Sequence, residues 1–138
     1  MAITRLPSRI EFQELSRLRI YEARTLLAAS EACASGAYYL AGYAVECAFK
    51  ARIAGMSFEA FYANSNANNY ITHDLKKLLF YAGLEIPPDT ELQENWTIVK
   101  AWTEESRYFV HSVPEAQNVV NAVNDSQKGV LIWSVTQW

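Results

Sequence analysis

The chain has 138 residues, of which 51% are hydrophobic, 20% charged and 13% aromatic. This length and composition are typical of one domain with its own core, and they argue against a disordered tail, a collagen-like fibre or a disulfide-stapled miniprotein. Twelve basic and 15 acidic residues leave a formal charge of −3, so no global positive field attracts nucleic acid. We therefore expect a single domain over residues 1–138, no DNA binding, and only local contact with any RNA.

The cysteines and the start of the chain favour a cytoplasmic location. Cys33 and Cys47 both lie in alanine-rich helical sequence, where a cysteine is by default a small buried hydrophobe in a reduced compartment. Residues 1–7 lack the apolar segment of a secretion signal. The longest weakly polar stretch, residues 36–45, is too short to span a membrane and carries three tyrosines. We expect a cytoplasmic protein without membrane contact.

Helical periodicity dominates the first half of the chain. Apolar positions at three- and four-residue steps predict one long helix over residues 10–34, which Ser35 and Gly36 end. A second helix is predicted from residue 37 to Gly55. One side of it carries small and apolar residues that let a neighbouring helix approach closely: Ala37, Leu40, Ala41, Ala44, Val45 and Ala48. The opposite side carries Tyr39, Tyr43, Glu46 and Lys50.

Capping signals place the remaining helices. A short apolar piece at residues 58–62 and an asparagine-rich loop at residues 64–69 precede Thr72, which we expect to cap a helix that Gly83 ends. The capping box at residues 90–93 opens a helix that carries Trp96, Val99 and Trp102. The signal at residues 112–115 opens a last helix that runs to the end of the chain. With no strand pattern, the sequence predicts an all-α, up-and-down bundle of four to five main helices.

Four features occur together between Leu15 and Tyr108: the long opening helix, the string GAYYLAGYAVECAFKA at residues 36–51, the Thr72-His73-Asp74-Leu75 cap, and the segment at residues 102–108. With these features the chain resembles the HEPN family. The resemblance implies a HEPN-like helical bundle, usually a homodimer, often encoded beside a minimal nucleotidyltransferase in prokaryotic toxin–antitoxin or defence modules. Catalytic members are metal-independent ribonucleases, in which an Arg is followed by four to six residues and a His, and the two copies face each other across the dimer.

The only candidate for that motif departs from the family pattern. Arg107 and His111 are separated by three residues, and the residue after Arg107 is Tyr108 rather than a small polar one. In a helix the two side chains share a face, so that the Arg holds a scissile phosphate and the His takes the proton of the 2′-hydroxyl. Ser112 and Pro114 place a helix boundary just downstream and make that register less secure.

Two polar clusters each have a structural and a functional interpretation. Glu46 and Lys50 are spaced as a solvated helix pair; alternatively, Glu46 lies in the bundle or in a dimer cleft, accepts hydrogen bonds from Arg107 or Tyr108 and supports catalysis. His73 and Asp74 form a local cap or line a partner-binding cleft, but no third metal ligand has credible spacing, so we expect no metal and no cofactor.

Aromatic and acidic residues indicate where a second copy, a nucleotide or RNA could and could not bind. Trp96 and Trp102 are expected in the core, whereas Trp133 and Trp138 are harder to bury and mark a candidate dimer surface. Tyr39 and Tyr43 are either core residues or the lining of a nucleotide cleft. Seven acidic residues between positions 85 and 115 place negative charge near the Arg–His pair, which opposes RNA binding there.

Three hypotheses follow from the sequence. The first is a HEPN-like dimeric bundle that acts with a nucleotidyltransferase partner and binds nucleotide or RNA. The second is a metal-independent endoribonuclease toxin that uses Arg107 and His111, with support from Glu46. The third is a purely structural or regulatory oligomerisation bundle.

Overall fold

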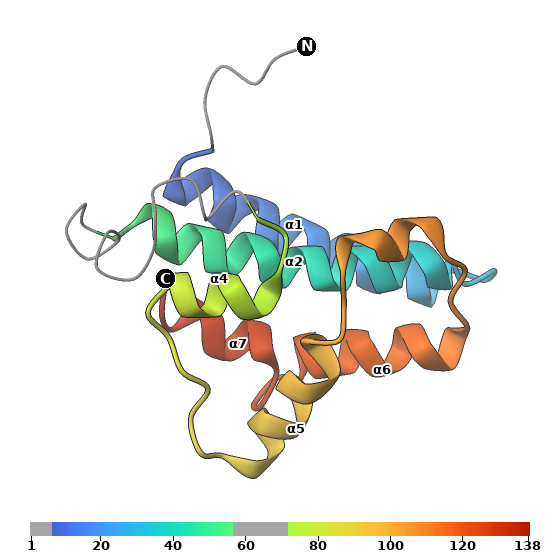
Figure 1. The fold of residues 1–138 in the computed structure, drawn as a ribbon. Helices are drawn as coiled ribbons and strands as arrows, with labels where there is room; N and C mark the ends of the chain where they lie inside the picture. Colours follow the sequence, from blue (N-terminus) through green and yellow to red (C-terminus); the bar gives the residue numbers. More distant parts are fainter. Residues whose placement is uncertain (1–6, 57–71) are drawn as a thin grey trace.

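The computed structural model describes residues 7–56 and 72–138, and all regular structure in these two ranges is helical (Figure 1). The elements in chain order are α1 (Arg9–Ala28), α2 (Ala34–Ala54), α4 (Leu75–Tyr81), α5 (Thr90–Val99), the 3₁₀ helix η2 (Glu104–Tyr108), α6 (Val113–Asn124) and α7 (Val130–Val135). The expected all-α helical bundle is confirmed. The segments at residues 58–62 and 64–69 lie outside the described residues.

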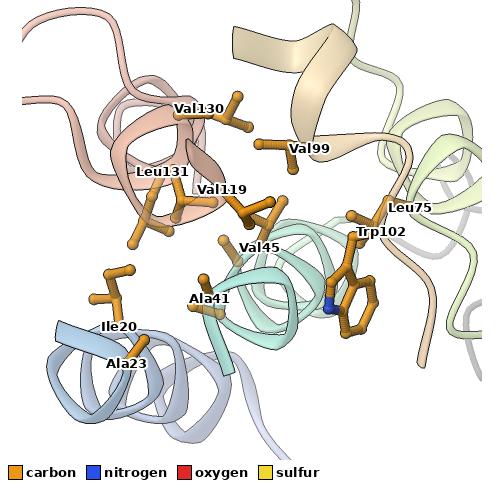
Figure 2. Close-up of a cluster of buried hydrophobic side chains, with 14 of the residues drawn as sticks. Ile20, Ala23, Ala41, Val45, Leu75, Val99, Trp102, Val119, Val130 and Leu131 are labelled. Atoms are coloured by element: carbon orange, nitrogen blue, oxygen red, sulfur yellow. The ribbon is translucent and has the colours of Figure 1, made fainter. Parts of the chain in front are cut away.

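Helix α2 is the central element of the bundle. It contacts α1, α4, η2, α6 and α7, and α1 lies along its length (Figure 1). Its alanine face is buried as predicted, and Figure 2 shows Ala41 and Val45 surrounded by side chains of other helices. These neighbours come from both ends of the chain: Ile20, Ala23, Val119, Val130 and Leu131. Because η2 and α4 cover the other side, α2 is buried around most of its circumference.

The break between the first two helices lies earlier than the sequence predicted. Helix α1 ends at Ala28, because Ala29 has an extended conformation, and the backbone N–H of Cys33 then donates to the carbonyl of Leu26. Ser35 and Gly36 therefore belong to the first turn of α2 instead of ending α1. A side chain at Gly36 would place its Cβ 3.2 Å from Leu26, so glycine serves close packing here. Cys47 is buried as expected, but Cys33 lies in the connection and is exposed, and both thiols are free.

Caps also differ from the prediction by a residue or two. Asp74, not Thr72, caps α4 by accepting from the backbone N–H groups of Lys76 and Lys77, while the Thr72 hydroxyl accepts from the N–H of Asp74. Asp89, not Thr90, caps α5. In both cases an aspartate within two residues of the predicted threonine accepts from the first free N–H groups. The turn after α4 does contain Gly83, with a φ of 68°.

The last part of the chain forms two helices rather than one. The capping box of Ser112 and Glu115 opens α6 as predicted. Asp125 then interrupts the helix, because its carboxylate accepts from the backbone N–H groups of Gln127 and Lys128. Trp133 and Trp138 are partly buried and pack against the core. None of the helices in the described part of the chain is long and apolar enough to cross a membrane.

Candidate functional site

Glu46, in the middle of α2, is a buried carboxylate with two cationic or polar partners. Its side chain is 2% exposed, and its Oε2 lies 3.0 Å from Nζ of Lys50 and 3.0 Å from Nδ1 of His73. A solvated Glu46–Lys50 pair was therefore the wrong interpretation, since Lys50 is buried as well. The buried alternative is correct about Glu46, but its partners are Lys50 and His73 rather than Arg107 or Tyr108.

Local structure fixes the position of each of these groups. Lys50 lies one helical turn after Glu46, so both side chains share the side of α2 that α4 and η2 cover. His73 directly precedes Asp74, whose cap starts α4 and fixes the backbone at this point. The side chain of His73 is 47% exposed, in contrast to the carboxylate that it contacts. A buried acid thus holds one edge of an accessible imidazole ring.

Three buried polar atoms on or near the side of α2 that carries Glu46 lack a hydrogen-bond partner. Among the described residues, Glu46 Oε1, Trp102 Nε1 and Ser106 Oγ have no hydrogen-bond partner. An unpaired buried polar group costs about 1–3 kcal/mol, so native folds keep few of them without a reason. Trp102 covers this face so closely that it lies against Gly42, one turn before Glu46.

A pocket of about 570 Å³ opens where His73 lies. Its walls come from residues 72–77 around the start of α4, from residues 100–103, which connect α5 to η2, and from the first two residues of η2. The charged residues that line it are of both signs: Lys76, Lys77 and Lys100, with Asp74, Glu104 and Glu105. Asp74 is already engaged as the cap of α4. Such a lining suits a small polar ligand better than an apolar one.

Tyr39 and Tyr43 belong to an aromatic cluster beside the Glu46 site. The ring of Tyr39 lies 5.9 Å from that of Tyr43 and 6.0 Å from that of Trp102, measured between centroids. Burial is the main cause that raises the pKa of Tyr43, followed by the neighbouring Cys47. Both rings are partly buried and pack against the hydrophobic core. The core interpretation of these tyrosines therefore fits the structure better than a nucleotide cleft.

Arg107 and His111 do not share a helical face. Arg107 lies in the 3₁₀ helix η2, which ends at Tyr108, and Phe109 has an extended conformation with φ of −120° and ψ of 153°. The helical register required by the Arg–His interpretation is therefore absent, because a helix boundary separates the two residues. Arg107 is exposed; its Nη2 donates to the Tyr108 hydroxyl at 3.2 Å, and its guanidinium lies 4.9 Å from that ring centroid. These hydrogen bonds, first to Tyr108 and then to Tyr39, raise the pKa of Arg107.

His111 is held in place on several sides. Its ring stacks on Tyr38 with centroids 3.7 Å apart, its Nδ1 lies 3.2 Å from Oε2 of Glu115, and its backbone N–H donates to the hydroxyl of Ser35. The side chain is only 14% exposed. Its Nε2 is buried without a partner among the described residues. In this conformation the nitrogen that a general base would use does not reach a substrate.

Sequence reasoning missed two features. The first is the contact between Glu46 and His73, which the sequence assigns to two separate clusters. The signal for it is a capped His-Asp turn that follows a helix with an embedded Glu and Lys. The second is a run of exposed apolar side chains at residues 108–110.

Within residues 7–56 and 72–138, no three His, Cys, Asp or Glu side chains are grouped to hold a metal ion. No family model matches the chain, and neither a curated protein nor a solved structure matches it.

Proposed function

We propose that this chain is a HEPN-like helical-bundle protein that works as a homodimer. It would act as the partner component of a nucleotidyltransferase in a toxin–antitoxin or defence type of module, and would bind nucleotide or RNA in that setting. The resemblance over residues 15–108 and the all-α bundle support this proposal. The observation that carries it is an exposed apolar segment between η2 and α6.

That segment, here called the apolar strip, consists of Tyr108, Phe109, Val110 and Val113. All four side chains are exposed, and three of them follow one another in the chain. Exposed apolar residues that gather in one segment mark an interaction surface more often than single ones do. A second copy of this chain is the occupant that we propose for the strip.

The charges around the apolar strip favour a two-fold partner. Arg107 lies at one end of the strip and Glu115 follows its other end, so the same short surface carries both signs. In a two-fold interface residue i of one copy contacts residue j of the other and the reverse, which lets each cation meet the partner's acid. The arrangement also brings Arg107 from both copies to one interface, as the family resemblance implies.

The oligomeric state tests the dimer. Phe109→Glu places a charge in the strip, and Phe80→Glu is a matched control because the two side chains are 61% and 63% exposed. Light scattering after size exclusion should give twice the chain mass for the wild type and for Phe80→Glu, and the chain mass for Phe109→Glu. A wild-type monomer at high concentration would overturn the dimer, and equal behaviour of the two variants would overturn the apolar strip as its interface.

The partner is tested separately. A minimal nucleotidyltransferase gene beside the gene for this chain, whose product co-purifies with it, supports the module. A dimer without such a neighbour leaves the structural or regulatory oligomerisation bundle as the better function.

The ribonuclease alternative uses the same surface but has less geometric support. It requires His111 to leave its stack on Tyr38, because Nε2 is buried where it lies. Induced expression of the wild type beside an Arg107→Ala, His111→Ala double variant tests it. Toxicity of the wild type that the double variant loses would favour the ribonuclease; equal growth of both would exclude it.

A further inference from the structure

The chain has two histidines, and the one that faces the larger polar pocket has no part in the proposed dimer. We infer that His73 is a proton-accepting histidine for a small, hydroxyl-bearing polar ligand in this pocket, and that buried Glu46 is the residue that positions it. Glu46 lies on α2 and His73 directly precedes the cap of α4. Neither residue belongs to the apolar strip, so the inference is tested independently of the dimer.

The contact with Glu46 determines where the proton of His73 lies. A carboxylate paired with the ammonium group of Lys50 acts only as an acceptor, so the hydrogen bond of 3.0 Å at Nδ1 requires the imidazole to donate there. In the neutral ring, Nε2 is then the free acceptor. Because the two ring nitrogens point in widely different directions, the contact at Nδ1 leaves Nε2 outside the buried pair, in a side chain that is 47% exposed.

Burial gives Glu46 the rigidity that a positioning residue needs. The carboxylate is 2% exposed on the central helix, whereas the imidazole is 47% exposed and lines the pocket. A carboxylate that accepts a hydrogen bond from one ring nitrogen fixes the tautomer and the orientation of a functional histidine. When Nε2 accepts a proton from a ligand hydroxyl, the O–H bond breaks and its electron pair stays on the ligand oxygen, which becomes negatively charged. An N–H bond forms, and the adjacent carboxylate stabilises the imidazolium that results.

The pocket lining indicates the class of ligand. Three lysine side chains from α4 and its neighbourhood are available to an anionic group, while Glu104 and Glu105 on η2 restrict how much negative charge the pocket accepts. Thr72 and Thr103 add hydroxyl groups to the same wall. A small molecule with one anionic group and a hydroxyl suits this lining. Its single negative charge can pair with the lysines without adding much repulsion from the glutamates, and its hydroxyl supplies the proton that Nε2 accepts.

The tautomer of His73 is the first test. Long-range ¹⁵N–¹H spectra of the full chain at neutral pH should show His73 with its proton on Nδ1. In the double variant Glu46→Leu, Lys50→Met, which removes both charges of the pair together, His73 should revert to the Nε2–H form. His73 with its proton on Nε2 in the wild type, or an unchanged tautomer in the folded double variant, would overturn the inference.

Reactivity toward diethyl pyrocarbonate is the second test. Nε2 attacks a carbonyl carbon of the reagent and releases ethyl carbonate, which gives an N-carbethoxy histidine. Peptide mapping should show rapid modification of His73 and slow modification of His111, whose Nε2 is buried. The double variant should slow His73 by about tenfold, the lower end of what loss of an outer-shell carboxylate costs, while Glu115→Gln should leave that rate unchanged. Equal rates for both histidines, or a fully reactive His73 in the double variant, would contradict the inference.

Discussion

The two histidines form pairs with a glutamate that are opposite in burial. His73 is 47% exposed and contacts a Glu46 that is 2% exposed, whereas His111 is 14% exposed and contacts a Glu115 that is 58% exposed. The contact distances are almost the same, 3.0 Å and 3.2 Å from Nδ1 to Oε2. Distance alone therefore does not distinguish them; the group that is buried does.

The difference in burial separates a positioned base from a structural residue. In the first pair the carboxylate is fixed by the core and leaves the free edge of the imidazole accessible. In the second pair the stack on Tyr38 fixes the imidazole, and the carboxylate serves the capping box of α6. A histidine at a helix boundary is thus a candidate for chemistry only when its unbonded nitrogen stays reachable.

The largest effect should come from Gly42, which packs under Trp102. A Cβ at Gly42 would lie 2.2–2.4 Å from ring atoms of Trp102, which is part of the connection between α5 and η2. Because such overlap forces the ring and the connection outward, Gly42→Ala should reduce the free energy of unfolding by about 3 kcal/mol. Urea unfolding followed by tryptophan fluorescence measures this change.

Gly36→Ala is the matched control for that variant. Its Cβ would lie 3.2 Å from the flexible end of Leu26, so the same chemical change should alter stability by less than about 1 kcal/mol. Equal losses for the two variants would show that Trp102 is not held tightly against α2.

Removing Glu46 tests whether its pair with Lys50 is buried. Glu46→Leu leaves the ammonium of Lys50 buried without its partner and should cost about 3 kcal/mol, whereas the double variant with Lys50→Met should recover most of that loss. Thermal or urea unfolding of the wild type, the two single variants and the double variant gives the coupling free energy between Glu46 and Lys50. A single variant as stable as the wild type would mean that Lys50 reaches water and that the pair is not a buried one.

Sequence patterns predicted the helices well, because their signals are local. The alanine face of α2 and the capping box at Ser112 involve residues within a few positions of one another. Helix ends were less predictable. Ser35 and Gly36 resemble a helix end in isolation, but the close approach of Leu26 decides their place, and that contact links two different helices.

The candidate site was predictable only in its parts. Glu46, Lys50 and His73 were each identified from local spacing, yet 27 positions separate Glu46 from His73, and no periodicity reports a contact over that distance. The Arg107–His111 pair shows the reverse error. Its spacing suits a helix, but the chain there is too close to the cap at Ser112 and adopts a 3₁₀ turn followed by extended backbone.

A smaller loss of stability is expected from removing the Ser112 cap, which directly follows His111 and begins α6. The Ser112 hydroxyl accepts from the backbone N–H of Glu115, so Ser112→Ala should cost about 1 kcal/mol. The substitution should leave the reactivity of His73 toward diethyl pyrocarbonate unchanged, because that site lies on other elements. Unfolding by urea measures the loss, and a change at His73 would show that the two regions are coupled.

The smallest effect concerns pH and Glu115. Hydrogen bonds from Ser112 and then from His111 lower the pKa of this carboxyl, so the folded chain holds its ionised form more firmly than the unfolded chain does. The stabilisation is therefore present above the ordinary pKa of a glutamate and is lost as the pH falls through the lowered value. Glu115→Gln should flatten this part of the curve of unfolding free energy against pH, with little change at neutral pH. An acid limb as steep as that of the wild type would mean that Glu115 is solvated, and that the stack on Tyr38 alone keeps His111 in place.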